Sequence, residues 1–266
     1  DGRTMKISFS KILLMASLLM ASVSLTAQGS LERNPDNASR DQYRHPVQTL
    51  TFFNIDPWMD VVEISPGGGW YTEVLAKHLT GTLFAAHASP ESKSAYYRNS
   101  QRKFVEMIEA NQALYGNVDV HVFDPGARVL STPDNSADAV LTFRNVHNWM
   151  RRDNDASSFE LFYKTLKPGG ILGVVEHRAV PGTDRDSMIK SGYVTQAHVI
   201  KLAEDAGFIF EASSEVNANP ADTADHPRGV WTLPPNLRLG DVDRERYLEI
   251  GESDRMTLRF RKPSSD

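Results

Sequence analysis

The run from Val61 to Tyr71, VVEISPGGGWY, constrains the fold more than any other stretch of this chain. Its β-branched start predicts a short buried strand, its glycines predict a tight turn, and the apolar residues that follow at helical spacing predict a helix ending near Gly81. A strand that turns on glycines into a helix presents bare backbone N–H groups to whatever lies at the helix start. The sequence therefore predicts an α/β fold with a ligand at this turn.

The acidic residue of this run comes before the glycines. In the dinucleotide fingerprint the glycines come first and the acidic residue lies far downstream. The order Glu63-x-Ser65-x-Gly67-x-Gly69 instead resembles the first motif of class I S-adenosylmethionine (SAM)-dependent methyltransferases, acidic-x-Gly-x-Gly-x-Gly, with Ser65 at the first glycine. The glycines alone are also consistent with a tight turn that serves only the packing of the helix on the strand.

A second element supports the resemblance. Residues 166–178, LKPGGILGVVEHR, resemble the turn and fifth strand of the same family, and the step Ala206-Gly207-Phe208 before a later strand is also similar. The resemblance covers roughly Tyr43 to Pro263. It implies a Rossmann-like, doubly wound sheet of about seven strands, mostly parallel with an antiparallel last strand.

The pattern of apolar and polar residues, together with the turn residues, predicts where the individual helices and strands lie. A short helix is expected to begin at Pro46, with Val47, Leu50 and Phe53 on one face, and Ser89 is expected to cap a helix whose first residue is Pro90. The predicted strands cover residues 61–64, 82–87, 118–123, 138–143, 171–178, 208–215 and 256–262.

The N-terminal residues predict export. Lys6 and Lys11 precede or flank an apolar stretch over 12–25, and small residues follow near Ala27, which is the layout of a secretory signal peptide. We therefore expect a tag remnant plus signal peptide over 1–28, a flexible leader over 29–39, and a single domain over 40–266. Cleavage would leave an exported, periplasmic protein without a stable membrane span; an uncleaved N-terminal anchor is the alternative.

Composition excludes several classes of site. The chain has no cysteine, so disulfides, thiolate metal sites and a cysteine nucleophile are excluded. The net charge of −5 is mild and no basic tract occurs, so nucleic acid is not an expected partner. No carboxylate trio suggests a catalytic divalent metal, and we expect none. The oligomeric state stays open.

The resemblance implies SAM as the cofactor, held at the strand ends. In the family an acidic residue ends the second strand and binds the ribose hydroxyls, but His87 stands there, and imidazole lacks the two-oxygen grip of a carboxylate. Asp124 matches the position that contacts the adenine amino group, although a plain Asp-Pro-Gly turn is equally consistent with the residues. The expected cofactor-binding residues are Glu63, Ser65, Gly67, Gly68, Gly69, His87, Asp124 and Asn145.

Polar clusters follow the fourth and fifth predicted strands, where loops line the ligand crevice of a doubly wound sheet. The proline-rich stretch 217–243 is long enough to close over them as a lid. For each of these side chains taken singly, a structural role such as a helix cap or a solvated turn stays open. The expected catalytic residues are His147, Glu176, His177 and Arg178, and the expected substrate-binding residues are Tyr43, Arg44, Arg144, Trp149, Tyr193 and Trp231.

The resemblance implies methyl transfer from SAM to a small-molecule nucleophile by in-line displacement. A binding or accessory protein that keeps the fold without transferase activity is the alternative, favoured by predicted export, by Ser65 and by His87. An enzyme of the same fold that uses another nucleotide is a third reading.

Overall fold

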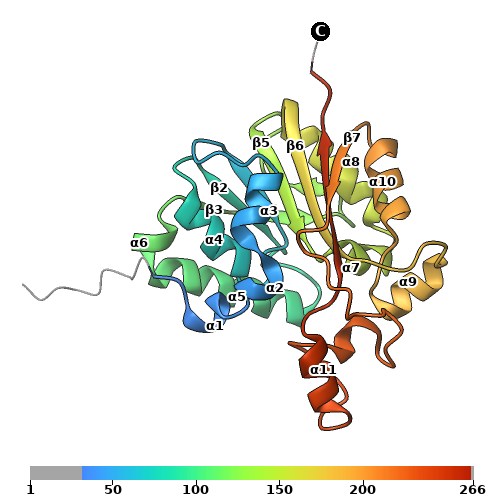
Figure 1. Ribbon diagram of the computed structural model, residues 1–266. Helices are drawn as coiled ribbons and strands as arrows, with labels where there is room; N and C mark the ends of the chain where they lie inside the picture. Colours follow the sequence, from blue (N-terminus) through green and yellow to red (C-terminus); the bar gives the residue numbers. More distant parts are fainter. Residues whose placement is uncertain (1–31, 265–266) are drawn as a thin grey trace, which may run out of the picture.

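A central β-sheet organises the chain, and the computed structural model describes it within residues 32–264; the predicted signal peptide lies outside the described residues. The sheet has eight strands in the order β4-β3-β2-β1-β5-β6-β8-β7 (Figure 1). Strands β1, β2, β3, β5 and β6 pair in parallel, whereas β8 is antiparallel to both β6 and β7. The strands are β1 Val61–Ile64, β2 Leu83–His87, β3 Val118–Asp124, β4 Val129–Leu130, β5 Ala137–Phe143, β6 Leu166–His177, β7 Ile209–Ser214 and β8 Arg255–Arg261.

Helices cover both faces of this sheet (Figure 1). Successive strand residues enter two separate cores: Val61 packs with the helices α3 to α6, and Val62 packs with the helices α7 to α10. Burial on both faces explains why the strands read as continuous apolar runs. The helices are α1 Pro35–Ala38, α2 Asp41–Arg44, α3 Pro46–Phe52, α4 Trp70–His78, α5 Ala95–Ala110, α6 Gln112–Tyr115, α7 Val146–Met150, α8 Asp155–Thr165, α9 Arg185–Ser191, α10 Gln196–Asp205 and α11 Arg244–Ile250, with a 3₁₀ turn at Gly229–Thr232.

The predicted doubly wound sheet with an antiparallel last strand is confirmed, and the two-residue strand β4 is an addition at its edge, antiparallel to β3. Because β1, β2, β5 and β6 run in parallel, their carboxyl ends meet at one edge, where the glycine turn and the polar loops also lie. Among the described helices, none is both long and apolar enough to cross a bilayer.

Two local predictions differ from the structure. Ser89 and Pro90 do not begin a helix, because the Ser89 hydroxyl accepts a hydrogen bond from the Glu91 backbone N–H and closes a local turn; α5 starts only at Ala95. Leu50 of α3 and Phe53, the residue that follows α3, are buried as expected, but Val47 is 72% exposed.

Within the predicted flexible leader, the described residues 33–37 are bonded to the folded body. Glu73 of α4 is buried, and its carboxylate accepts hydrogen bonds from Arg33 Nε at 2.9 Å and from Asn37 Nδ2 at 2.8 Å. A buried carboxylate needs such partners, which the sequence does not reveal because they lie about forty positions away in the chain. Helix α1 is therefore held against the start of α4.

Candidate active site

The glycine turn has the left-handed backbone that its sequence predicts. Gly67 and Gly69 have φ of 61° and 81°, and Ser65 has φ of 52°. Ser65 stands where the family motif has its first glycine, and it keeps the left-handed backbone that glycine favours. This conformation costs an L residue roughly 1–2 kcal/mol. A Cβ atom added at Gly67 or at Gly68 would meet no heavy atom within 4 Å. The turn thus leaves open space on the side where a ligand is expected.

Glu63 lies behind this turn. It is 2% exposed, and its Oε2 accepts a hydrogen bond of 2.6 Å from Thr72 Oγ1 of α4. Burial raises the pKa of the Glu63 carboxyl to about 8, although the hydrogen bond from Thr72 has the opposite effect and lowers it. The structure therefore places this predicted cofactor residue where it ties β1 to α4, outside the lining of the cleft described below.

This burial predicts a pH dependence. A carboxyl whose pKa rises from 4.5 in the unfolded chain to about 8 in the folded one binds protons more tightly when folded. The free energy of unfolding should therefore fall as pH rises from 4.5 to 8, by at most about 1.4 kcal/mol per pH unit. Glu63→Gln keeps the shape and removes this slope. Urea unfolding of both proteins over this pH range measures it; a difference that does not vary with pH would contradict the assignment.

His87 ends β2 beside the same turn. Its Nδ1 accepts a hydrogen bond of 2.8 Å from the Ala88 backbone N–H, so the ring proton is on Nε2, which lies 3.3 Å from the Gly67 carbonyl oxygen. Burial lowers the pKa of this imidazole and keeps it neutral. His87 is placed to brace the glycine turn, and both ring nitrogens already have partners.

A cleft of about 610 Å³ opens beside the turn at the carboxyl edge of the sheet. Asn145 closes its floor, since its Nδ2 donates to the Ile64 carbonyl at 3.0 Å and to Thr142 Oγ1 at 3.2 Å. Four predicted site residues line the cleft together: Ser65, Asp124, Asn145 and Trp149. The cleft therefore brings together residues from the turn after β1, the end of β3, and the loop and helix α7 that follow β5.

A second group of side chains lies on the other side of α7. His147 and Glu176 are 4% and 0% exposed, and His147 Nδ1 lies 3.0 Å from Glu176 Oε1. A carboxylate only accepts, so Nδ1 donates and Nε2 is the basic nitrogen of this imidazole. The rings of His177 and Trp231 lie 5.3 Å and 6.0 Å from that of His147, centroid to centroid. The loop after β5, the end of β6 and the proline-rich loop thus meet at His147.

The imidazole of His177 is a weaker base than an ordinary histidine. Its Nδ1 lies 2.5 Å from Ser253 Oγ, and the pKa of its imidazole is well below 6.5 because the ring is buried and lies beside His147 and Arg255. Atoms of His147, Glu176 and His177 lie within 4.8 Å of one another, a spacing that could hold a metal ion. Nearby arginines disfavour a divalent cation there, so the absence of a catalytic metal stays our prediction.

The remaining predicted residues lie around this group. Arg178 forms ion pairs of 2.8 Å with Asp254 and 2.7 Å with Glu215, which engage its guanidinium away from the cleft lining. The Tyr193 hydroxyl donates to Asp222 of the proline-rich loop, at 2.9 Å and 3.0 Å to its two oxygens. The same Asp222 accepts from the Asp254 backbone N–H. The predicted lid is thus a packed segment in this structure.

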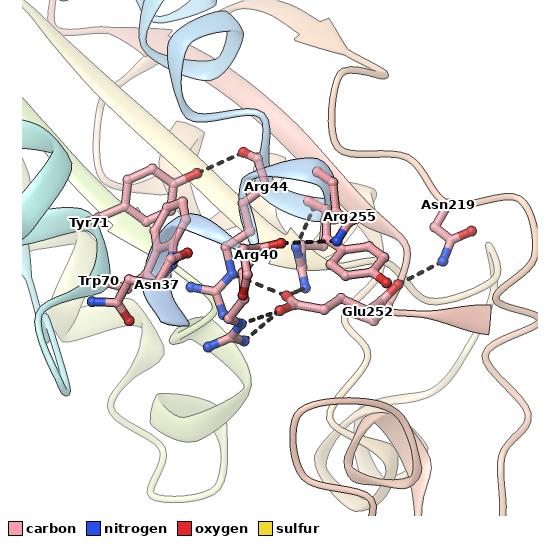
Figure 2. A network of polar contacts seen from close by, with 12 residues as sticks. Asn37, Arg40, Arg44, Trp70, Tyr71, Asn219, Glu252 and Arg255 are labelled. Atoms are coloured by element: carbon pink, nitrogen blue, oxygen red, sulfur yellow. Dashed lines mark hydrogen bonds and ion pairs between the residues drawn. The ribbon is translucent and has the colours of Figure 1, made fainter. Parts of the chain in front are cut away.

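Figure 2 shows a buried network that holds Arg44. Its guanidinium packs over the Trp70 ring at 4.5 Å, and its Nε donates to Glu252 at 3.1 Å. The Arg44 backbone carbonyl accepts from the Tyr71 hydroxyl at 3.2 Å. Tyr43 lies next to it in α2, and its carbonyl accepts from Arg255 at 3.0 Å. Predicted substrate residues of α2 therefore sit at the start of α4, close to the glycine turn.

Comparison with known proteins agrees with this geometry. Residues 62–174 match the methyltransferase domain family. The fold is that of a SAM-dependent methyltransferase from Aquifex aeolicus, which is 16% identical at a TM-score of 0.58 over 86% of this chain and 94% of that one. A putative sarcosine dimethylglycine methyltransferase from Galdieria sulphuraria is 15% identical at a TM-score of 0.61, over 87% and 88% of the two chains.

Not every protein of this fold is described as a methyltransferase. The cyclase SpnF is 16% identical at a TM-score of 0.59, over 84% of this chain and 81% of that one. No curated protein matches the chain significantly in sequence. At these identities the structural likeness establishes the methyltransferase fold alone.

Sequence reasoning did not assign Arg40, Glu252, Ser253 and Arg255 to the site. They reach it because β8 is inserted between β6 and β7, which pairs Arg255 with His177 across the strands. The available signal was the antiparallel last strand itself: its amino end must lie beside the carboxyl end of β6. The short polar run just before that strand therefore had to fall at the same edge as the glycine turn.

Proposed function

We propose that this protein transfers a methyl group from SAM to a small-molecule nucleophile. The observation that carries the proposal is the open, left-handed glycine turn at the end of β1, one helix away from the buried pair His147 and Glu176. The match of residues 62–174 to the methyltransferase domain family supports it.

The residues of the turn and cleft fit this cofactor. Open space at Gly67 and Gly68 admits a ligand close to the backbone, where the exposed N–H groups of the α4 start can donate. Asp124 at the end of β3 and Ser65 in the turn after β1 line the cleft, so an adenosyl group would lie between them. SAM would supply an electrophilic methyl on a sulfonium, whose departing sulfide needs no proton.

The protein's own task is then alignment, exclusion of water and, for an acceptor that must lose a proton, base catalysis. His147 is the base of this proposal. Glu176 accepts from Nδ1 and also from the His177 backbone N–H at 2.8 Å, so the carboxylate is itself fixed and holds the imidazole in the tautomer with a basic Nε2. The Trp231 ring lies 6.0 Å from the imidazole in a T-shaped arrangement, and His147 is buried, so little water reaches it.

Calorimetric titration of the full chain with SAM and with S-adenosylhomocysteine tests the proposal. We expect saturable binding of both, and release of S-adenosylhomocysteine when the protein meets an acceptor that it methylates. No heat with either compound, together with no co-purified adenosyl ligand, would contradict it.

A second candidate is a protein that keeps this fold for binding without methyl transfer. The specific observation in its favour is His87, which stands where the family places a ribose-binding carboxylate. Both nitrogens of its neutral ring are already engaged, one with the Gly67 carbonyl and one with the Ala88 backbone N–H. Binding of S-adenosylhomocysteine without turnover of SAM across acidic, amine and thiol acceptors would favour this candidate.

A further inference from the structure

The network of Figure 2 carries more positive than negative charge. We call Arg40, Arg44, Arg144 and Arg255 the arginine cluster. Glu252 is the carboxylate at its centre: it accepts from Arg40 Nε at 2.6 Å and from Arg44 Nε at 3.1 Å, and it also pairs with Arg255. Three guanidinium groups thus bind one carboxylate, and Arg144 lies close enough to feel the charges of Arg255 and Glu252.

This imbalance is costly. Arg44 and Arg255 are each only 2% exposed, yet Arg44 Nη2 and Arg255 Nε have no hydrogen-bond partner. Burial and the neighbouring Arg144 charge lower the pKa of Arg44 to about 8. A buried charge without a counter-charge costs several kcal/mol, so a binding group of opposite sign would offset that cost.

Arg144 is the member of the cluster whose guanidinium is left without a bonded partner. It is half-buried, and within residues 32–264 its guanidinium makes no hydrogen bond or ion pair, whereas Arg40, which is also half-buried, is bonded to Glu252. Its backbone is left-handed, with φ of 63°, and its N–H donates to the Val175 carbonyl at 2.7 Å. That bond places Arg144 beside the residue before Glu176, and next in sequence to Asn145 of the cleft.

We infer that the arginine cluster binds an acidic oxyanion group, a carboxylate, phosphate or sulfate, of the methyl acceptor, with Arg144 as its first contact. This inference rests on the proposed function and narrows its substrate to an anionic small molecule. Guanidinium groups recognise such oxyanions through paired N–H donors. The site would hold the acceptor beside His147, because Arg255 pairs in register with His177.

The same chemistry has a second source, the carboxylate at the amino-acid end of SAM. The position of the cluster favours the acceptor, because none of its arginines lines the cofactor cleft. The Arg144 backbone N–H instead bonds to Val175, and Arg255 pairs with His177, both at the end of β6. Two arms of one experiment separate these sources.

The first arm measures anion binding. The full chain, saturated with S-adenosylhomocysteine, is titrated at constant ionic strength with inorganic phosphate, sulfate and acetate, with chloride as the balancing salt. At least one probe should bind the wild-type protein, Arg144→Gln should weaken it about tenfold or more, and Arg144→Lys should restore part of the affinity. Arg102→Gln, on the exposed side of α5, is the matched control and should bind like wild type. No binding by wild type, or equal binding by Arg144→Gln, would overturn the inference.

The second arm compares S-adenosylhomocysteine with 5′-methylthioadenosine, which lacks the amino-acid end. Arg144→Gln should leave the affinity for both within a few-fold of wild type. If Arg144→Gln lowers the affinity for S-adenosylhomocysteine alone by tenfold or more, the cluster binds the cofactor carboxylate, and the inferred acceptor site is overturned. If wild type binds neither adenosyl compound, the proposed function fails, while the anion titration repeated without them still tests the cluster. Thermal unfolding midpoints of all variants establish that each is folded.

Discussion

His147→Ala should lower turnover by about 10² to 10⁴-fold for an acceptor that must lose a proton, and should leave the affinity for S-adenosylhomocysteine within a few-fold of wild type. The imidazole lies against Glu176, His177 and Trp231 on one side of α7, whereas the cofactor cleft is lined by Asn145 and Trp149 from the other side. Its loss therefore removes a base without removing a cofactor contact.

Release of S-adenosylhomocysteine measures the turnover, and calorimetry measures the affinity. His121→Ala is the control, since His121 lies in β3 and its imidazole contacts Ser131 rather than the His147 group. Glu176→Gln should reduce turnover to a similar degree, and the double variant should be little worse than either single one, because the two side chains act as a unit. Equal loss of turnover and of cofactor affinity in His147→Ala would give His147 a structural role.

The sequence was a good guide to the sheet and to the turn on it. Short apolar and β-branched runs bounded by turn residues are local features of the sequence, so buried strands such as β1 and β5 can be found without knowledge of the rest of the fold. The left-handed conformation at Gly67 and Gly69 follows from glycine itself. Ser65 shows that a side chain can be tolerated at such a position when its environment leaves room.

The partners of buried charges were not predictable in the same way. Glu63 reads as a ligand-facing acid at a strand end, but its hydrogen bond to Thr72 is made inside the helix–sheet interface. Glu73 and Glu252 each bind arginines that lie far away in the sequence. Such pairings depend on how helices dock on the sheet, and periodicity carries no information about docking.

The same limit applies to the acceptor side. Placing His147 and Glu176 at strand ends predicts that they are near each other, since parallel strands end at one edge. It does not predict that Glu176 points at the imidazole, or that β8 brings Arg255 and Glu252 alongside. Side-chain direction at the end of a strand is set by the neighbouring strand, which here comes from the far end of the chain.

Gly67→Val should weaken binding of S-adenosylhomocysteine by at least about 100-fold, which corresponds to ~2.7 kcal/mol, while the protein stays folded. A Cβ atom at this position meets no protein atom within 4 Å, so the valine would extend into space that the ligand needs. The backbone there has φ of 61°, where a β-branched residue is strained, so some stability is lost as well.

The control for that strain is Gly240→Val. Gly240 has φ of 63° and likewise no heavy atom within 4 Å of an added Cβ, but it lies in the loop before α11, away from the turn after β1. Both variants should therefore lower the thermal midpoint to a similar extent, and only Gly67→Val should lose the adenosyl ligand. If Gly67→Val binds within a few-fold of wild type, the glycine turn serves only the packing of α4 on β1. If both variants lose binding alike, the loss reflects backbone strain, and the open space beside Gly67 belongs to no ligand.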